Sequence, residues 1–314
     1  MIQSPKFLVT DKQGKEIPEE ELPLFNFLAN DGDIHHFLAG YIPSHWHKEL
    51  EVFLLLEGDI QIGIGDCTYR LHSGDGCFIN AEVIHSFTAD VSSPCRYRSF
   101  VFSPDIIGGM PGSIFDTAYV RPLIETGVSF LKFPKGDEHK FYFQQFDRAF
   151  FACASEEYGY EFQIREALSN ILLYVTSKST EITDHSVFLR KENRLKENRL
   201  KQMITWIDSH LEQTITVSAI AKAANICTRE CQRIFNQYLH YSPIAYVNRK
   251  RIYYAAKQLS DTDDPMIMIA LNCGYSNPAY FSRQFKEYMG STPSEYRTAV
   301  KESRKSCSAK QQGI

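Results

Sequence analysis

The sequence lacks the features of exported and membrane-bound chains. Its first residues carry neither a basic segment nor an apolar core, and no apolar run in the chain approaches the roughly 18 residues that span a bilayer. The 8 cysteines are scattered and include no Cys-x-x-Cys pair. We therefore expect a cytoplasmic protein whose thiols are reduced and mostly buried. A redox or metal role for Cys227 and Cys231, four residues apart, is the alternative.

Net charge is also small, but only when the chain is taken as a whole. The total is −4, whereas residues 1–193 carry 16 Lys and Arg against 28 Asp and Glu, and residues 194–314 carry 18 against 10. With 314 residues, 43% of them hydrophobic, the chain can build two cores. An acidic part followed by a basic part predicts that only the C-terminal part contacts a polyanion. A charge fluctuation between two ordinary domains is the alternative.

The C-terminal part contains an internal repeat. Each copy has an Ile-Ala pair, an Arg-x-Phe group, a Ser-Pro or Thr-Pro pair and a tyrosine, and corresponding residues are 49 or 50 positions apart. Apolar residues at helical spacing on both sides of a break predict helix, turn and helix in each copy. The breaks fall at Asn225 and Gly274, residue types that adopt a positive φ at low cost.

Polar residues that face outward on the second helix of each copy are the expected DNA contacts. Arg233 and Arg283 are the leading candidates for base readers or phosphate contacts. The other candidates are Arg229, Gln232, Asn277, Ala279 and Ser282. A helix opened by Pro243 would hold the two reading helices about 34 Å apart, which is one turn of the duplex. A solvated helix face is the alternative for each side chain.

The second copy carries the residues of a known family. Residues 196–297 resemble the DNA-binding domain of the AraC/XylS transcription regulators, although Asn225 and His240 stand where that family usually has glycine. The resemblance implies promoter DNA as a partner, dimerisation, and contact with RNA polymerase if the protein is an activator. The matching groups are Ile269-Ala270, Gly274-Tyr275, Tyr280-Phe281-Ser282-Arg283-x-Phe285-Lys286 and Gly290-x-Thr292-Pro293-x-x-Tyr296-Arg297.

The N-terminal part has the pattern of a small antiparallel β-structure. Between about residues 33 and 102, short apolar or alternating runs are bounded by Gly and Asp, which predicts a jelly roll or barrel. The predicted strands lie at 51–56, 60–64, 69–71 and 77–79. Residues 1–30 are interpreted as irregular, and 103–136 as a long connection with a short helix at 115–125.

A histidine-rich pattern lies within these strands. His45-x-His47-x-x-x-Glu51, followed later by His85, resembles the two motifs of the cupins, although Asn80 and Glu82 stand where those motifs usually have Pro and Gly. Three imidazoles and a carboxylate suit a divalent metal such as zinc, iron or manganese.

Two alternatives to a metal site remain for this cluster. The polar groups, together with Trp46 and Tyr69, could contact a small effector, with Phe53 as a further stacking surface; a sugar is the first expectation and an aromatic or organic acid the second. The other alternative is an internal polar network.

After residue 138 the period of the apolar residues becomes helical. Two helices within about 138–178 are predicted to pack on the sheet and to offer an antiparallel dimer seam, with intramolecular packing alone as the alternative. The apolar positions that define them are Phe143, Phe146, Phe150, Ile164, Leu168, Ile171, Leu172 and Val175.

These observations predict an α+β protein of two domains. Residues 1–182 form a cupin-like effector-sensing and dimerisation domain, 183–195 a linker, 196–300 a double helix-turn-helix domain, and 301–314 a flexible tail. The expected function is that of a homodimeric bacterial transcription regulator switched by a small molecule, with no catalytic residue. The alternatives are a cupin metalloenzyme with a DNA-binding tail and a DNA-binding protein that needs no ligand.

Overall fold

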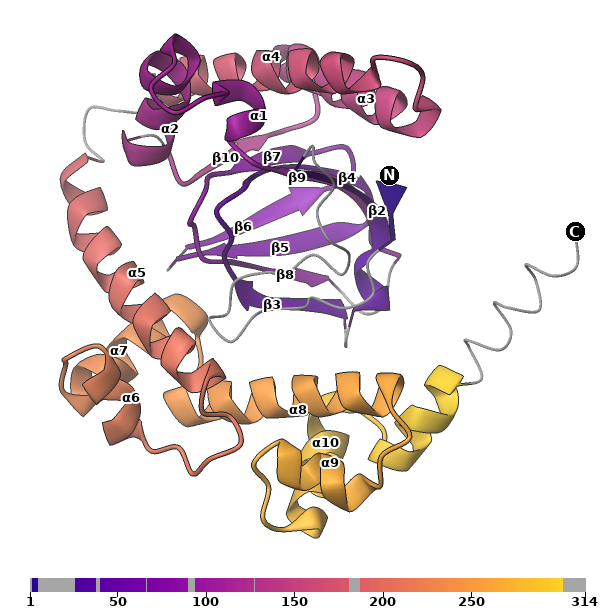
Figure 1. The fold of residues 1–314 in the computed structure, drawn as a ribbon, viewed down its shortest axis with the longest axis vertical. Helices are drawn as coiled ribbons and strands as arrows, with labels where there is room; N and C mark the ends of the chain where they lie inside the picture. Colours follow the sequence, from indigo (N-terminus) through magenta and orange to yellow (C-terminus); the bar gives the residue numbers. More distant parts are fainter. Residues whose placement is uncertain are drawn as a thin grey trace, which may run out of the picture. The chain divides into compact units, whose positions relative to one another are not determined.

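The computed structural model describes residues 2–4, 26–37, 40–65, 67–89, 94–126, 128–180 and 187–301. The chain divides into two units, 1–198 and 199–314, and the division falls within helix α5 (Val187–Asp208). Strands with flanking helices form the first unit, and the described residues of the second unit form helices and their connections (Figure 1). Among the described helices none is long and apolar enough to cross a membrane.

Two sheets form the centre of the N-terminal unit. One has the strand order β1-β2-β9-β4-β7-β10 and the other β3-β8-β5-β6; β1 pairs in parallel with β2, and all other pairs are antiparallel. The strands are β1 (Ile2–Gln3), β2 (Phe27–Asp33), β3 (Tyr41–His45), β4 (Leu50–Glu57), β5 (Asp59–Ile64), β6 (Cys67–His72), β7 (Gly76–Ile79), β8 (His85–Ala89), β9 (Arg96–Phe102) and β10 (Phe130–Phe133). The four strands predicted between residues 51 and 79 are thus confirmed as β4 to β7.

Three strands, β1, β2 and β10, lie outside the region predicted to be β-structure, and the two longer ones, β2 and β10, show the reason. Strand β2 contains Asn, Asp and Gly, which disfavour strands, but it pairs with β9 over all seven residues and buries Phe27 and Ala29. Strand β10 lies in the stretch predicted to be a connection and pairs with β7. In both cases a neighbouring strand and a core decide the conformation, and local propensity does not.

Helices cover the outer face of the six-stranded sheet (Figure 1). The two helices predicted at 138–178 are α3 (Lys140–Ser155) and α4 (Tyr160–Thr180), and the core beneath them includes Val52, Phe100 and Phe146. The short helix predicted at 115–125 is present as well. It consists of the π-helical turn η3 (Asp116–Val120) and α2 (Arg121–Thr126), near α1 (Asp105–Gly108). The described residues of this unit also include the 3-10 turns η1 (Ile34–His36) and η4 (Asp137–His139).

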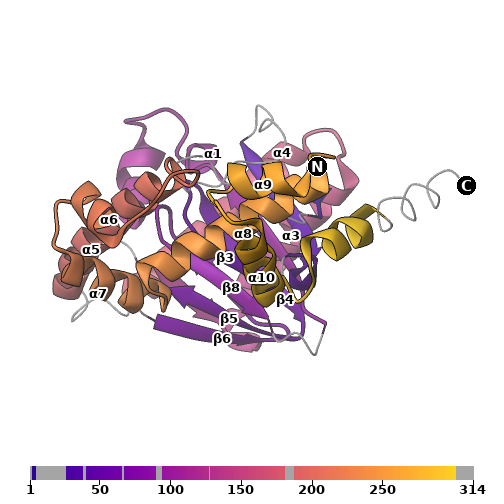
Figure 2. The same ribbon diagram turned by 90° about the horizontal axis from the view of Figure 1, so that it is seen from below.

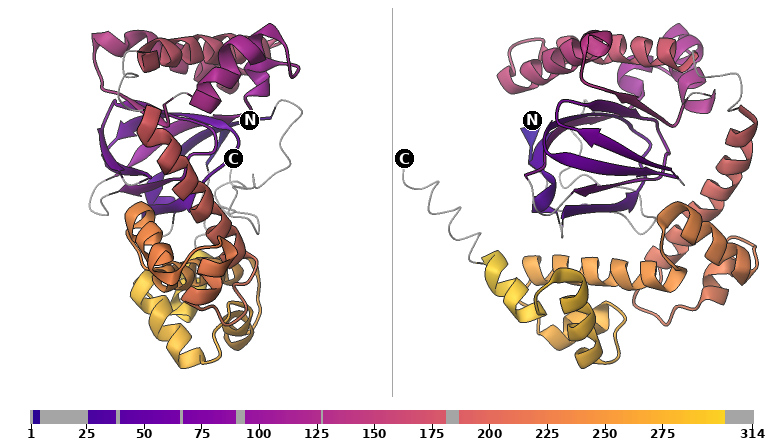
Figure 3. Two further views of the ribbon diagram at one scale, coloured as in Figure 1. Left: turned by 90° about the vertical axis from the view of Figure 1, so that its left-hand side faces the viewer. Right: turned by 180° about the vertical axis from the view of Figure 1, so that it is seen from behind.

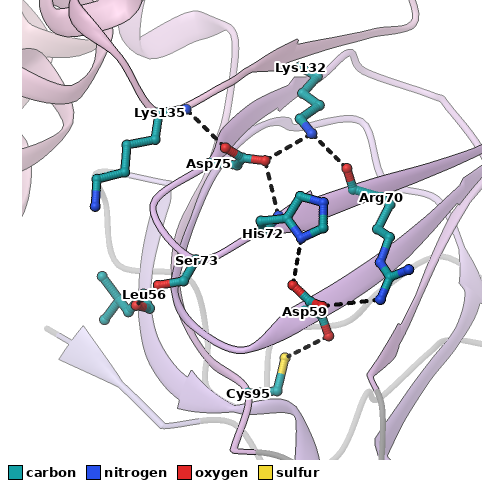
Figure 4. A network of polar contacts seen from close by, with 9 residues as sticks. All are labelled: Leu56, Asp59, Arg70, His72, Ser73, Asp75, Cys95, Lys132 and Lys135. Atoms are coloured by element: carbon teal, nitrogen blue, oxygen red, sulfur yellow. Dashed lines mark hydrogen bonds and ion pairs between the residues drawn. The ribbon is translucent and has the colours of Figure 1, made fainter.

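A polar network fixes β10 at the sheet edge (Figure 4). The carboxylate of Asp75 accepts hydrogen bonds from the backbone N–H groups of His72, at 3.0 Å, and Lys135, at 2.9 Å. It also forms an ion pair with Lys132 at 2.8 Å. Burial alone would raise the pKa of Asp75, but these partners hold it below its usual value. Because Lys132 lies in β10 and Lys135 follows it, the ionised carboxylate joins β10 to the turn before β7.

The C-terminal unit repeats one arrangement at the two ends of a long helix. Helix α8 (Pro243–Asp261) runs between the pair α6 (Val217–Ala223) and α7 (Thr228–Leu239) and the pair α9 (Met266–Asn272) and α10 (Pro278–Met289) (Figures 2 and 3). Its 19 residues span about 28 Å at 1.5 Å per residue. The predicted helix-turn-helix pairs, and the helix that joins them, are confirmed.

The two turns have the predicted conformation but different surroundings. Asn225 has φ 53° and Gly274 φ 77°. A Cβ atom on Gly274 would lie 2.4 Å from the carbonyl oxygen of Leu211 and 2.7 Å from Nη2 of Arg251. Arg251 donates to the carbonyls of Leu211, at 2.9 Å, and Gln213, at 2.6 Å, which joins α8 to the chain before α6. The second turn therefore requires glycine for space as well as for conformation.

Candidate functional site

Helix α7 presents a row of exposed polar side chains opposite its buried face. Arg229, Gln232 and Arg233, all predicted DNA contacts, are exposed, while Cys231, Ile234 and Phe235 on the other side are fully buried. Asn236, one turn after Gln232, continues the exposed row. The row is four side chains long and lies on the second helix of a helix-turn-helix, which is the helix that enters the major groove in such motifs.

Helix α10 presents the corresponding row. Ala279, Ser282 and Arg283 are exposed, and Lys286 continues the row as Asn236 does on α7. Phe281 and Phe285 form the buried face. Asn236 and Lys286 were not among the predicted DNA contacts. Both nevertheless follow the other candidates at helical spacing, and they are 50 residues apart.

Asn277 has a different position from the other predicted contacts. It is the N-cap of α10, and its Oδ1 accepts hydrogen bonds from the backbone N–H groups of Ala279, at 2.9 Å, and Tyr280, at 3.1 Å. The corresponding N-cap of α7 is Cys227, whose side chain makes no such bond. The geometry assigns Asn277 to starting the helix, and a base contact by its side chain stays a prediction.

The two leading arginines have different neighbours. Arg233 donates from Nε and Nη2 to the two carboxylate oxygens of Glu230, at 2.7 Å and 2.6 Å, and from Nη1 to Gln237 at 3.3 Å. Arg283 lies over the ring of Tyr280, with its guanidinium carbon 5.3 Å from the ring centroid. Within the described chain no carboxylate is within ion-pair distance of Arg283. Glu230 and Tyr280 occupy the same position of the repeat, three residues before the arginine.

The histidine-rich pattern of the N-terminal unit forms one buried cluster. His45 at the end of β3 pairs in register with His85 at the start of β8, and His47, just before β4, and Glu51, within β4, complete the group. All four are at most 5% exposed. The ring centroid of His85 lies 4.1 Å from that of His45 and 5.1 Å from that of His47. The four residues that were predicted as one group are therefore close together in the fold.

Backbone carbonyls orient each imidazole in the same way. Nδ1 of His45, His47 and His85 lies 2.8 to 2.9 Å from the carbonyl oxygen two residues before or after it, in Pro43, Glu49 and Val83. A carbonyl can only accept, so Nδ1 carries a proton in each ring, and in a neutral ring Nε2 then carries the lone pair that a metal would use. Such a carbonyl contact to the second nitrogen is typical of histidines that bind metal.

Glu51 supplies a negative charge to this cluster. Its Oε2 lies 3.5 Å from Nε2 of His47 and 3.3 Å from Nε2 of His85. Burial alone would raise the pKa of Glu51, but the adjacent imidazoles of His47 and His85 hold it well below its usual value. Burial, together with the neighbouring His85 and His47, lowers the pKa of His45 well below its usual value.

Two arrangements satisfy a buried carboxylate among three imidazoles: a second proton on an imidazole, or a divalent cation. The three imidazoles place one ligand atom each within 4.8 Å of one another. Bonds of about 2.1 Å to a single ion allow donor atoms to be up to about 4.2 Å apart, so a small inward shift closes the set. The donor set therefore fits zinc, iron or manganese.

The aromatic residues predicted near the histidines are engaged in packing. Trp46 is buried, and the ring of Tyr69 packs 4.3 Å from that of Phe130. Phe53 is stacked between Phe87 and Tyr97, each at 5.2 Å. These side chains shape the interior of the unit, and an effector contact by Trp46 or Tyr69 stays a prediction.

The two departures from the cupin motifs have structural explanations. Asn80 is buried, and its side-chain amide donates to the carbonyls of Leu123, at 2.8 Å, and Val128, at 3.0 Å, which holds the chain before β10 against the barrel. Glu82 has φ 64°, the conformation that the glycine of the motif would adopt. Its N–H donates to the carbonyl of His47 at 2.8 Å, so the residue also fixes the backbone of the cluster.

Cys227 and Cys231 do not form a shared site. Cys227 is exposed at the start of α7, whereas Cys231 is buried and burial raises the pKa of its thiol to about 11. Five of the seven described cysteines are buried, which confirms the expectation of mostly buried thiols.

Comparison with known proteins gives matches over both units. The model of the AraC-like ligand binding domain matches residues 33–168, and that of a helix-turn-helix domain matches residues 220–299. The regulatory protein SoxS of Escherichia coli (strain K12) is 33% identical over 98 residues, which are 31% of this chain and 92% of SoxS. The uncharacterised HTH-type transcriptional regulator YdeC of Bacillus subtilis (strain 168) is 28% identical over 93% of this chain and 98% of its own length.

A solved structure is also similar to part of this chain. It is a transcriptional regulator with an AraC-type DNA-binding domain from Chromobacterium violaceum, 26% identical, covering 33% of this chain and 93% of that chain with a TM-score of 0.32.

Proposed function

The chain belongs to the AraC family of transcription regulators, and we propose that it reads promoter DNA with the exposed rows of α7 and α10. The observation that carries this proposal is the match between the rows. The rows occupy the same positions of the repeat, 50 residues apart, and share one arginine: Arg229, Gln232, Arg233 and Asn236 correspond to Ala279, Ser282, Arg283 and Lys286. Two reading helices at the ends of one rigid α8 can enter successive major-groove segments on one side of the duplex.

Binding of the intact protein to fragments of its own genome tests this function. At physiological salt, its best fragment should bind at least about 1,000 times more tightly than random DNA of the same length. Equal affinity for all fragments would contradict sequence-specific recognition. Because promoter DNA is the partner, the protein acts in the bacterial cytoplasm, and as an activator it would also contact RNA polymerase.

We propose further that the N-terminal unit senses a small molecule and does not catalyse a reaction. The model that matches residues 33–168 is that of a ligand binding domain. Cys77 and Tyr142 are the described titratable groups outside the cluster that interact with Glu51, and burial raises the pKa of both, so neither is activated as a nucleophile or base. A sugar or an organic acid is the expected effector.

A thermal-shift screen of the intact protein against sugars, sugar acids and aromatic acids tests the sensor. A specific ligand at about 100 times its Kd stabilises the unit that binds it by about 2.7 kcal/mol. The hit should then change the affinity for the bound DNA fragment, because an effector acts only if it binds two states of the protein differently. Regulation that persists without residues 1–182 would instead favour a regulator that needs no ligand.

A second proposal for this unit is a bound divalent cation at His45, His47, Glu51 and His85. Its support is the inward orientation of three Nε2 atoms around a buried, ionised carboxylate. The ion would neutralise Glu51 and join β3, β4 and β8. Elemental analysis of protein purified without chelator should give about one metal per chain, and Glu51→Gln should lower that ratio. If the protein binds no metal even after reloading, the cluster is an internal polar network. If the metal-loaded protein hydrolyses or oxidises a substrate, the metalloenzyme is favoured.

Dimerisation through α3 and α4 is the remaining proposal for this unit. The apolar positions that predicted these helices are buried against the sheet, apart from the half-buried Phe143, so they cannot form a seam. Phe151, Phe162 and Leu173 remain exposed, at 71%, 76% and 49%. Sedimentation of the intact protein should give a dimer that Phe151→Glu with Phe162→Glu dissociates. A wild-type monomer at tens of micromolar would contradict this proposal.

A further inference from the structure

The residue three positions before each reading arginine differs between the two motifs. It is Glu230 in α7, where it holds Arg233 by two hydrogen bonds, and Tyr280 in α10, where its ring lies under Arg283. We propose that Glu230 is a specificity-determining residue. By pairing with Arg233 it positions this arginine to read guanine and removes its net attraction for phosphates. This inference rests on the proposed DNA contacts of α7.

Glu230 holds one edge of the Arg233 guanidinium. Glu230 occupies Nε and the adjacent N–H of Nη2, which is one edge of the guanidinium. The N–H groups at the end of the side chain, one on Nη1 and one on Nη2, form a second fork. That end fork matches O6 and N7 of guanine in the major groove. Gln237, at 3.3 Å from Nη1, further limits rotation of the group.

The charge of the pair explains why it would favour discrimination. An arginine without a carboxylate is attracted by every phosphate, which strengthens binding to all sequences alike. The Glu230–Arg233 pair has no net charge, and in an incorrect register the carboxylate approaches phosphates or base acceptors and is repelled. Only a guanine opposite the end fork offsets the desolvation of the pair.

Arg283 lies over an aromatic ring and, among the described residues, has no carboxylate within ion-pair distance. The face of Tyr280 orients its guanidinium without cancelling the charge. Arg283 therefore contributes both to binding of any DNA and to reading of its own base pair. The two motifs thus have different roles, since the first contributes mainly sequence discrimination and the second contributes affinity as well.

The Glu230→Gln variant of the intact protein tests the inference. Binding is measured at several salt concentrations on the selected DNA site, on the same site with the guanines of the first-motif half replaced, and on random DNA. We expect preference for those guanines to fall about tenfold, the scale of one bidentate base contact. Random DNA should bind more tightly, and the slope of log K against log salt should steepen by about 0.9, the value for one additional phosphate.

Glu287→Gln is the matched control. Glu287 is an exposed residue of α10 that accepts a hydrogen bond from Gln284 at 2.8 Å and, within the described helix, forms no ion pair with Arg283. Its replacement removes the same charge from a reading helix, so it should strengthen binding to random DNA without affecting preference for the first-motif guanines. Arg233→Ala should abolish that preference, and Glu230→Gln should then have no further effect on it.

Two results would overturn the inference. If Glu230→Gln retains the wild-type preference for the guanines and differs from Glu287→Gln in nothing, Glu230 is only a surface partner of Arg233, while the DNA-binding function stands. If the wild-type protein prefers no base in either half-site, the proposed function fails and the inference fails with it. Melting temperatures of the variants within about 2 °C of the wild-type value would show that the variants are folded.

Discussion

The two helix-turn-helix motifs share one backbone but differ in what surrounds their equivalent residues. Both turns have a positive φ, and both second helices expose their polar row at the same repeat positions. Yet the first turn accepts an asparagine, whereas the second has no room for any side chain. The reading arginine is paired with a carboxylate in one motif and lies over an aromatic ring in the other. Equivalent positions in a repeat can therefore have different energetic roles.

The largest effect should come from the turn that has no room for a side chain. Gly274→Ala places a Cβ atom against the carbonyl of Leu211 in a conformation that alanine disfavours, and we expect a loss of about 2 to 4 kcal/mol in the free energy of unfolding. Urea unfolding of the intact protein measures the change, followed by circular dichroism and by tryptophan fluorescence, to which Trp46 and Trp206 both contribute.

Two substitutions serve as controls for the turn. Gly290→Ala introduces the same strain at φ 72° where no heavy atom lies within 4 Å of the new Cβ, and Asn225→Ala tests the first turn. Each should cost about 1 kcal/mol. An equal loss of unfolding free energy at positions 274 and 290 would show that the close contact with the carbonyl of Leu211 adds nothing to the cost of the positive φ.

The next largest effect should come from the arginine without a carboxylate. Arg283→Ala should cost about 1 to 3 kcal/mol of specific binding and also lower the salt slope, because it removes a base contact and a positive charge together. The double variant Glu230→Gln with Arg233→Ala removes the pair without changing the net charge, and it should cost a similar amount on the selected site but leave the salt slope nearly unchanged. Equal changes of slope in the two variants would contradict the division between the motifs. Titrations of labelled DNA at four salt concentrations provide the comparison.

The smallest effect should come from the last position of each row. Lys286→Ala should weaken binding to all sequences by about 1 kcal/mol or less and lower the salt slope by about 0.9, as expected for one phosphate contact. Asn236→Ala, the equivalent change on α7, should leave the slope unchanged because asparagine carries no charge. The same titrations measure both variants. A change of the salt slope with Asn236→Ala would contradict this assignment of the phosphate contact to Lys286 and not to Asn236.

The sequence predicted most clearly those features that depend on neighbours along the chain. The helix-turn-helix pairs, the turns at Asn225 and Gly274 and the strands β4 to β7 depend on apolar periodicity and on residues that favour turns. Strand β2 was missed because its stability depends on β9, about 70 residues later. The role of Asn80 was hidden for the same reason, since its partners Leu123 and Val128 lie 43 and 48 residues away.

The candidate sites were predicted as groups, but not in their detailed roles. Spacing placed His45, His47, Glu51 and His85 together, yet only the fold shows that all three Nδ1 atoms face carbonyls and that the cluster is closed to solvent. Arg233 and Arg283 look equivalent in the sequence. Glu230 was visible three residues before Arg233, but its pairing depends on side-chain conformations, which periodicity does not determine.

The measurement that tests the account most directly is selection of DNA sites from a random pool by the intact protein and by its Arg233→Ala and Arg283→Ala variants. The account predicts two blocks of preferred bases about 10 base pairs apart. Each variant should lose a different block of preferred bases. A single block, or loss of the same block in both variants, would contradict the conclusion that α7 and α10 read successive segments of one duplex.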